Sequence, residues 1–147
     1  MEVAAMSLLD LLRDDSIHHP RHPASIPWER DEYGHYYRLL PLHPAQIGLE
    51  GEGGVYLLWH WGQSPEWIYV GASDDLAASL DYARNTDIIL EYEPHGGIFV
   101  TWAFFKPEYR SGVVNFLKGA LSPKIDLVLP KDSFDAQAEA VPVTAPA

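Results

Sequence analysis

Hydrophobic and polar positions follow a regular pattern from about residue 54 onward. Residues 54–60 and 67–71 are rich in aromatic and β-branched side chains, and turn-forming residues separate them at 62–65. This pattern is typical of two strands joined in a hairpin. Residues 98–105 are apolar at nearly every position, which predicts a strand that is covered on both faces and therefore central in its sheet.

Two helices are predicted after these strands. Residues 73–84 begin with a serine that can cap a helix and with aspartates that suit its positive end, and apolar residues then recur at helical spacing. Pro107 is placed to open a second helix, whose apolar stripe ends before Pro123. Residues 87–93 suit a further strand or an extended loop.

The two ends of the chain are less regular. Residues 1–15 predict a short helix with a broad apolar face, either docked on its own domain or presented to a partner. Residues 16–32 contain three prolines and three histidines, which predicts an extended linker and argues against a fixed metal site. Residues 33–42 predict one more strand. Residues 131–147 lack periodicity and predict a disordered tail, which leaves one domain over residues 33–130.

The order strand, strand, helix, strand, helix predicts an α/β fold of the α+β kind, with a small, mainly antiparallel sheet of three to five strands flanked by helices. A chain of 147 residues with 47% hydrophobic content is sufficient for one packed domain. Cysteine is absent, which excludes thiol catalysis, thiolate zinc sites and disulfides. Neither a signal peptide nor a membrane span is visible in the sequence, so we expect a cytoplasmic protein.

The net charge of the chain limits the kinds of partner that it can bind. The chain has 10 basic and 21 acidic residues, a net charge of −11, and residues 51–100 hold eight acids and a single base, Arg84. Such a chain repels nucleic acid and anionic membranes at long range. We therefore expect a protein partner rather than nucleic acid or a membrane.

Two short motifs face each other across the predicted hairpin. Residues 54–56 (GVY) and 69–71 (YVG) resemble the paired signature of the GIY-YIG superfamily of nucleases and nuclease-derived domains. Residues 73–76 resemble the start of that family's first helix. Residues 117–126 resemble its closing segment, with Asp126 where an asparagine is usual. The resemblance covers about half of the chain and implies a GIY-YIG-like fold.

The resemblance also implies what a working site would require. In active members two tyrosines, an arginine and a glutamate activate a water, neutralise the scissile phosphate and hold one divalent metal. The tyrosines correspond here to Tyr56 and Tyr69, with Tyr82 available to line the same cleft. Ser79 holds the arginine's position and Val114 the glutamate's. Since the loss of one electrostatic group typically costs about 10²–10³ in rate, we predict no cleavage, no metal and no cofactor.

Aromatic residues supply the remaining candidate surface. The candidate binding residues are Tyr56, Tyr69, Trp61, Trp67 and Asp126. Aromatic side chains are enriched at interface hot spots, so the predicted sheet is expected to present a face that binds a partner. The alternative is that the N-terminal segment covers these rings. The exposure of Trp61 and Trp67 to solvent distinguishes a binding face from a covered one.

Three hypotheses follow. The preferred one is a degenerate GIY-YIG-like domain that has lost catalysis and binds or scaffolds proteins. The second is a divergent endonuclease that cleaves DNA phosphodiesters with Mg²⁺, uses Tyr56, Tyr69 and Tyr82, and takes its arginine and glutamate from other positions. The third is an unrelated adaptor, which would follow if residues 54–71 did not form a hairpin.

Overall fold

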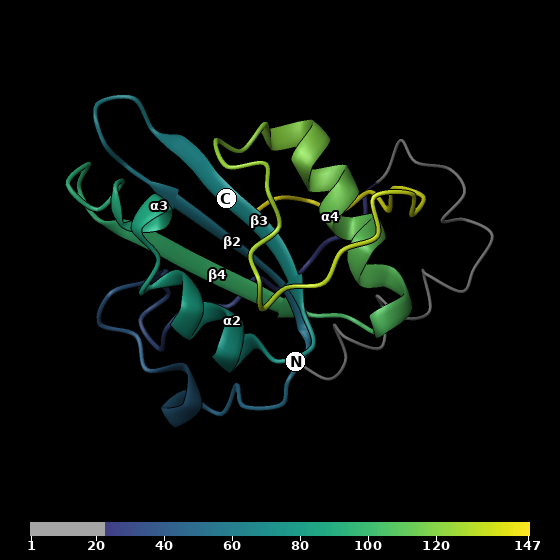
Figure 1. Ribbon diagram of the computed structural model, residues 1–147, viewed down its shortest axis with the longest axis horizontal. Helices are drawn as coiled ribbons and strands as arrows, with labels where there is room; N and C mark the ends of the chain where they lie inside the picture. The colour runs from purple at the N-terminus through teal and green to yellow at the C-terminus, as the bar shows by residue number, and fades with distance from the viewer. Residues whose placement is uncertain (1–22) are drawn as a thin grey trace.

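The computed structural model describes residues 23–147 (Figure 1). The predicted helix over residues 1–15 and the first part of the predicted linker lie outside the described residues. Four strands form one antiparallel sheet in the order β1-β4-β2-β3. The strands are β1 (Tyr37–Arg38), β2 (Gly54–His60), β3 (Glu66–Ser73) and β4 (Ile98–Phe104). The helices are η2 (Pro44–Ile47, a 3-10 helix), α2 (Leu76–Ala83), α3 (Asp87–Leu90) and α4 (Pro107–Leu121). The predicted α+β class is confirmed.

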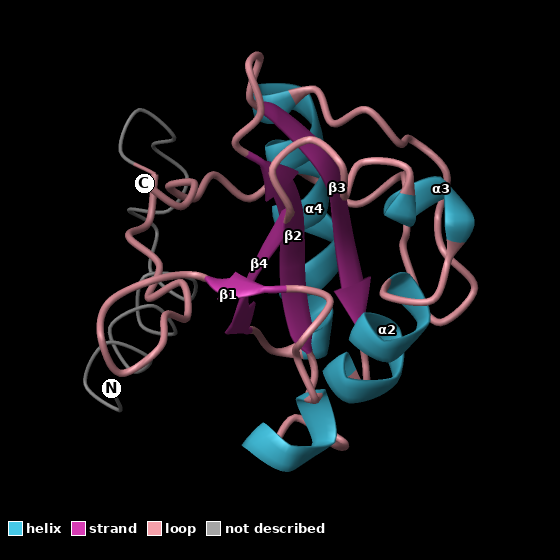
Figure 2. Cartoon of the chain, turned by 90° about the vertical axis from the view of Figure 1, so that its left-hand side faces the viewer, coloured by secondary structure: helices cyan, strands magenta, loops and turns pink. Residues whose placement is uncertain are grey.

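Both faces of the sheet are covered. α4 lies on one side and α2 on the other (Figures 1 and 2). Alternate residues of a strand point to opposite faces, so Tyr56 and Leu58 join the core beneath α2, whereas Val55 and Leu57 join the core beneath α4. All seven residues of β2 are buried for this reason.

The predicted hairpin and the second helix are confirmed. β2 and β3 pair antiparallel, with an irregularity between Leu58 and Trp59. β4 lies between β1 and β2, as its apolar sequence predicts. α4 begins with Pro107 and ends at Leu121, two residues before Pro123. Among the described residues, no helix combines the length and apolarity needed to cross a membrane.

Three local predictions need correction. The first helix begins at Leu76 and is capped by Asp75, because Ser73 is held in β3 and its Oγ accepts a hydrogen bond from Asp75 N at 2.9 Å. The expected strand or loop at residues 87–93 contains the helix α3, whose Ile89 is fully buried. A short apolar run does not distinguish a strand from a buried helix. The strand expected over residues 33–42 pairs with β4 at two residues only.

The C-terminal segment, residues 131–147, is ordered against the domain, so the prediction of a disordered tail is wrong. Val141 N donates to Gly112 O of α4 at 2.9 Å, and Val143 is only 2% exposed. The segment lacks periodicity because it follows the surface of α4 instead of forming a helix or strand of its own. Val143 is nevertheless buried, and Phe134 and Val141 are half-buried against the core beneath α4.

The described part of the predicted linker also packs on the domain. Ala24 forms an isolated parallel bridge with Val143. Ile26 and Trp28 are buried, and Trp28 Nε1 donates to Thr144 O at 2.7 Å. The packed domain therefore extends beyond the predicted range of 33–130 at both ends, because these two irregular segments bury each other's apolar side chains.

Two glycines of α4 allow this packing to be tested. A Cβ at Gly112 would collide with Glu139 O and would lie 2.7 Å from Val141 Cγ2, whereas a Cβ at Gly119 would meet nothing within 4 Å. We expect Gly112→Ala to destabilise the fold by about 1–2 kcal/mol through overpacking, and Gly119→Ala to be neutral or stabilising by up to about 1 kcal/mol through helix propensity.

Urea unfolding and limited proteolysis of both variants measure this difference. Gly112→Ala should also speed protease cleavage within residues 131–147, because the segment must move away from α4. Equal stability and equal cleavage of the two variants would show that the segment does not depend on contact with Gly112.

Candidate functional site

Tyr56 and Tyr69 are brought together by the hairpin. β2 and β3 place Tyr56 opposite Gly71 and Leu58 opposite Tyr69, so the tyrosine rings lie diagonally on one face, with centroids 5.7 Å apart. The rings are 0% and 2% exposed. The sequence therefore predicts the pairing of the two tyrosines, but the site is closed to solvent.

Asp132 of the C-terminal segment lies against this pair. The hydroxyl of Tyr56 donates to Asp132 Oδ2 at 2.7 Å, and the hydroxyl of Tyr69 donates to the same oxygen at 2.5 Å. Leu129 N in turn donates to the Tyr69 hydroxyl at 3.0 Å. Such short O–H···O distances are typical of an ionised acceptor. We call the side chains of Tyr56, Tyr69 and Asp132 the tyrosine–aspartate cluster.

Burial sets the proton affinities in the tyrosine–aspartate cluster. It raises the pKa of Asp132 above the ordinary value, and the hydrogen bonds that its carboxylate accepts from Tyr69 and Tyr56 oppose this shift only in part. Burial and the neighbouring carboxylate also raise the pKa of both tyrosines well above the usual range. Since raised tyrosine pKa values keep the phenols protonated at neutral pH, neither is suited to act as a base. The second oxygen of the carboxyl group, Oδ1, is buried without a hydrogen-bond partner.

Ser79 and Val114 stand at the positions where the GIY-YIG resemblance would place an arginine and a glutamate, and both are buried. Ser79 is 1% exposed, and its hydroxyl donates to Ser73 Oγ at 2.6 Å. Val114 is 2% exposed and, with Tyr69 and Asp132, lines a cavity of about 10 Å³. A volume of this size is comparable to one water molecule, so a phosphodiester does not fit.

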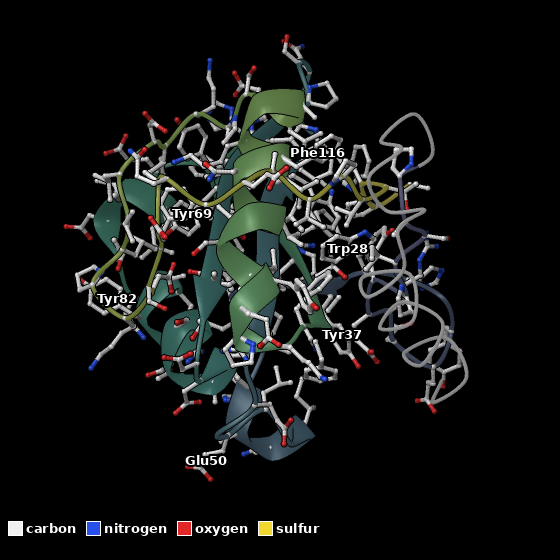
Figure 3. All side chains as sticks on the ribbon, turned by 90° about the vertical axis from the view of Figure 1, so that its right-hand side faces the viewer. Trp28, Tyr37, Glu50, Tyr69, Tyr82 and Phe116 are labelled. Atoms are coloured by element: carbon white, nitrogen blue, oxygen red, sulfur yellow. The ribbon has the colours of Figure 1, made fainter. Side chains whose placement is uncertain are left out.

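One basic residue lines the same small cavity. The ammonium group of Lys118 pairs with the carboxylate of Asp126 at 3.0 Å, and that carboxylate is 90% exposed. Asp126 therefore neutralises Lys118 at the surface and does not join the tyrosine–aspartate cluster. Tyr82 lies apart from Tyr69 (Figure 3) and packs, half-buried, against the same core as the other two tyrosines, and it does not line the small cavity beside Tyr69.

The donor set at the tyrosines does not suit the divalent metal that the resemblance implies. Asp132 Oδ2 already accepts two hydroxyl hydrogen bonds, and Val114 offers no donor atom. Divalent magnesium is usually bound by one or two carboxylates together with waters or substrate phosphates. Within residues 23–147, no group of three or more histidine, aspartate or glutamate side chains is placed to hold a metal ion.

His60 lies between Trp59 and Trp61 in the sequence, and its side chain is buried at 1% exposure. Gly62 N donates to its Nδ1 at 3.1 Å, so Nε2 carries the proton and donates to Glu66 Oε1 at 2.9 Å. Both ring nitrogens are thus engaged in holding the hairpin together.

The predicted tryptophans form part of a group of packed rings at the far end of the sheet from the start of α4. We call this group the aromatic cluster; it consists of Tyr36, Trp59, Trp61, Trp67 and Phe99. Trp61 is 55% exposed and Trp67 is half-buried. The described residues before β2, 23–53, therefore leave Trp61 open to solvent.

No known relative identifies this chain. No protein-family model matches it, and neither a curated protein nor a solved structure does. The geometry of the tyrosine–aspartate cluster, the exposed surface and the charge therefore provide the indications of function.

Proposed function

We propose that this protein is a non-catalytic, GIY-YIG-like domain that acts as a protein-binding or scaffolding module. The observation that carries the proposal is the bonding of both tyrosine hydroxyls to Asp132 inside the core. Hydroxyls that act on a substrate must reach it, whereas these two attach the chain's own C-terminal segment to β2 and β3. The cluster therefore serves the fold.

Charge supports the same proposal. Ser79 and Val114 supply neither a cation nor a metal ligand where a scissile phosphate would need both. Residues 51–100, which contain both tyrosines, hold eight acids and one base, and such a surface repels a phosphate backbone.

The exposed aromatic surface supports a protein partner. Trp61 at 55% exposure is held by neighbouring rings. Tryptophan and other aromatic residues are enriched in the cores of protein interfaces. A rigid, exposed indole on an acidic domain is therefore a suitable anchor for another protein.

The alternative of a divergent endonuclease has one observation in its favour. Lys118 and Asp132 line the same small cavity as Tyr69, so a cation and an acid do lie near one tyrosine. That arrangement reaches a DNA strand only if residues 127–134 leave the site.

A plasmid-nicking assay with Mg²⁺ or Mn²⁺ separates the two functions. We expect no cleavage above the buffer control, and no difference between the wild type, Tyr69→Phe and the control Tyr33→Phe, whose ring is exposed and remote from the cluster. Robust cutting that is abolished by Tyr69→Phe and retained by Tyr33→Phe would refute the proposal and support the endonuclease.

A further inference from the structure

Trp61 differs from the other tryptophans in its environment. Trp28, Trp59 and Trp102 are between 2% and 8% exposed, whereas Trp61 is 55% exposed. Its ring lies 6.2 Å from Trp59 and 6.4 Å from Phe99, both near edge-on. These contacts hold the indole in place and reduce the side-chain entropy that a partner would otherwise have to remove on binding.

Neighbouring rings of the aromatic cluster already carry guanidinium groups. Arg30 lies over the ring of Tyr36 at 4.3 Å, and Arg38 lies over the ring of Phe99 at 5.4 Å. In the described part of the chain, no lysine or arginine lies over the ring of Trp61. Indole is the side chain that attracts a cation most strongly, so the most exposed ring of the cluster is also the one best suited to receive a cation from outside.

The net charge of the whole chain, −11, sets the sign of the partner at long range. Residues 51–100, which include Trp61, contribute −7 of this charge, and Arg30 and Arg38 lie on neighbouring rings of the aromatic cluster. A field of this sign speeds the approach of positively charged segments and slows acidic ones. Charge and ring chemistry therefore favour the same class of ligand.

We propose that Trp61 and the aromatic cluster form the docking surface for a basic segment of a protein partner, with a lysine or arginine side chain of that segment seated over the indole of Trp61. This inference rests on the proposed protein-binding function and adds to it the surface and the chemical class of the partner.

The test uses the full chain and a blocked peptide of alternating arginine and glycine, titrated by calorimetry. A peptide in which citrulline replaces arginine keeps the shape and removes the charge, and a glutamate peptide reverses it. The variant is Trp61→Leu, which keeps an apolar side chain without the ring. Its matched control is Phe104→Leu, because Phe104 is 52% exposed near the opposite end of the sheet.

We expect Trp61→Leu to weaken binding of the arginine peptide about two- to tenfold, and Phe104→Leu to leave it unchanged. Trp61→Tyr should retain part of the affinity because it retains a ring. The citrulline and glutamate peptides should bind more weakly than the arginine peptide. Urea unfolding of each variant establishes that the fold is intact.

No weakening by Trp61→Leu, or equal weakening by Trp61→Leu and Phe104→Leu, would overturn the inference, since the binding would then not depend specifically on the indole of Trp61. Tighter Trp61-dependent binding of the glutamate peptide, or of a single-stranded oligo-dT used as a further probe, would overturn the class of partner. If the arginine-peptide test fails while the nicking assay stays negative, the proposed non-catalytic module stands and only the docking surface is refuted. DNA cleavage that depends on Tyr69 would contradict both the non-catalytic module and the docking surface.

Discussion

Replacing Asp132 with alanine is expected to lower the free energy of unfolding by about 2–4 kcal/mol. The change leaves the hydroxyls of Tyr56 and Tyr69 buried without the acceptor that both use, and each unsatisfied buried donor costs about 1–3 kcal/mol. Relief of the desolvated charge, seen in the raised pKa of Asp132, offsets part of the loss. Urea unfolding followed by circular dichroism measures the sum.

Asp126→Ala is the matched control for this change. Its carboxylate is 90% exposed and forms a surface ion pair with Lys118, so its removal should cost about 0.5 kcal/mol or less. A similarly small effect for Asp132→Ala would contradict a structural role for the tyrosine–aspartate cluster and would reopen the question of what the buried carboxylate does.

The variant Asp132→Asn tests the raised pKa of the buried carboxyl group through the pH dependence of the free energy of unfolding. Because the pKa of Asp132 is raised above 3.8 in the fold, the folded protein binds this proton more tightly than the unfolded chain does. The protonated carboxyl group therefore contributes to the free energy of unfolding. This contribution is fully present below pH 3.8 and is lost as the pH rises through the raised pKa. Asp132→Asn lacks this titration, so its stability relative to the wild type should increase between pH 4 and pH 7. A difference that is flat or decreases over this range would contradict the raised pKa.

Gly71→Ala is expected to be the second strongly destabilising change, by about 2–4 kcal/mol. A Cβ at this position would collide with Asp132 Oδ2 and would lie 2.6 Å from Tyr69 Cε2 and 3.0 Å from Tyr56 Cε1. Overpacking of a core costs about 1–3 kcal/mol, and here it also displaces two buried hydrogen bonds. Chemical denaturation of the purified variant measures the effect.

A double-mutant cycle makes this prediction specific to the site. Once Asp132→Ala has removed the carboxylate, the new methyl group loses its closest obstacle, so Gly71→Ala should cost less in that background than in the wild type. Coupling of about 1 kcal/mol or more is expected for groups in direct contact. Strict additivity would mean that the glycine is needed for a reason other than contact with Asp132.

Gly71 also shows what a short sequence motif does not predict. Gly71 ends the strand predicted over residues 67–71, whereas β3 continues to Ser73 and places Gly71 opposite Tyr56. The position requires the absence of a side chain because the tyrosine–aspartate cluster occupies that space. Nothing local in the sequence conveys this requirement.

Local sequence patterns predict the hairpin, the central apolar strand β4 and the helix α4. These elements are encoded by periods of about two and 3.6 residues and by proline positions, which are properties of neighbouring residues. The sequence also placed Tyr56 and Tyr69 on one hairpin, because a short turn fixes which strands pair.

The hydrogen-bond partner of those tyrosines, in contrast, comes from contacts between segments that are distant in the sequence. Asp132 lies 76 residues from Tyr56 and 63 from Tyr69, in a segment without periodicity, so no local pattern links them. The same holds for residues 131–147 as a whole, whose order depends on contacts with α4 and with Ala24. Burial and hydrogen bonding join both tyrosine hydroxyls to this distant segment, because a buried hydroxyl must find an acceptor within the fold.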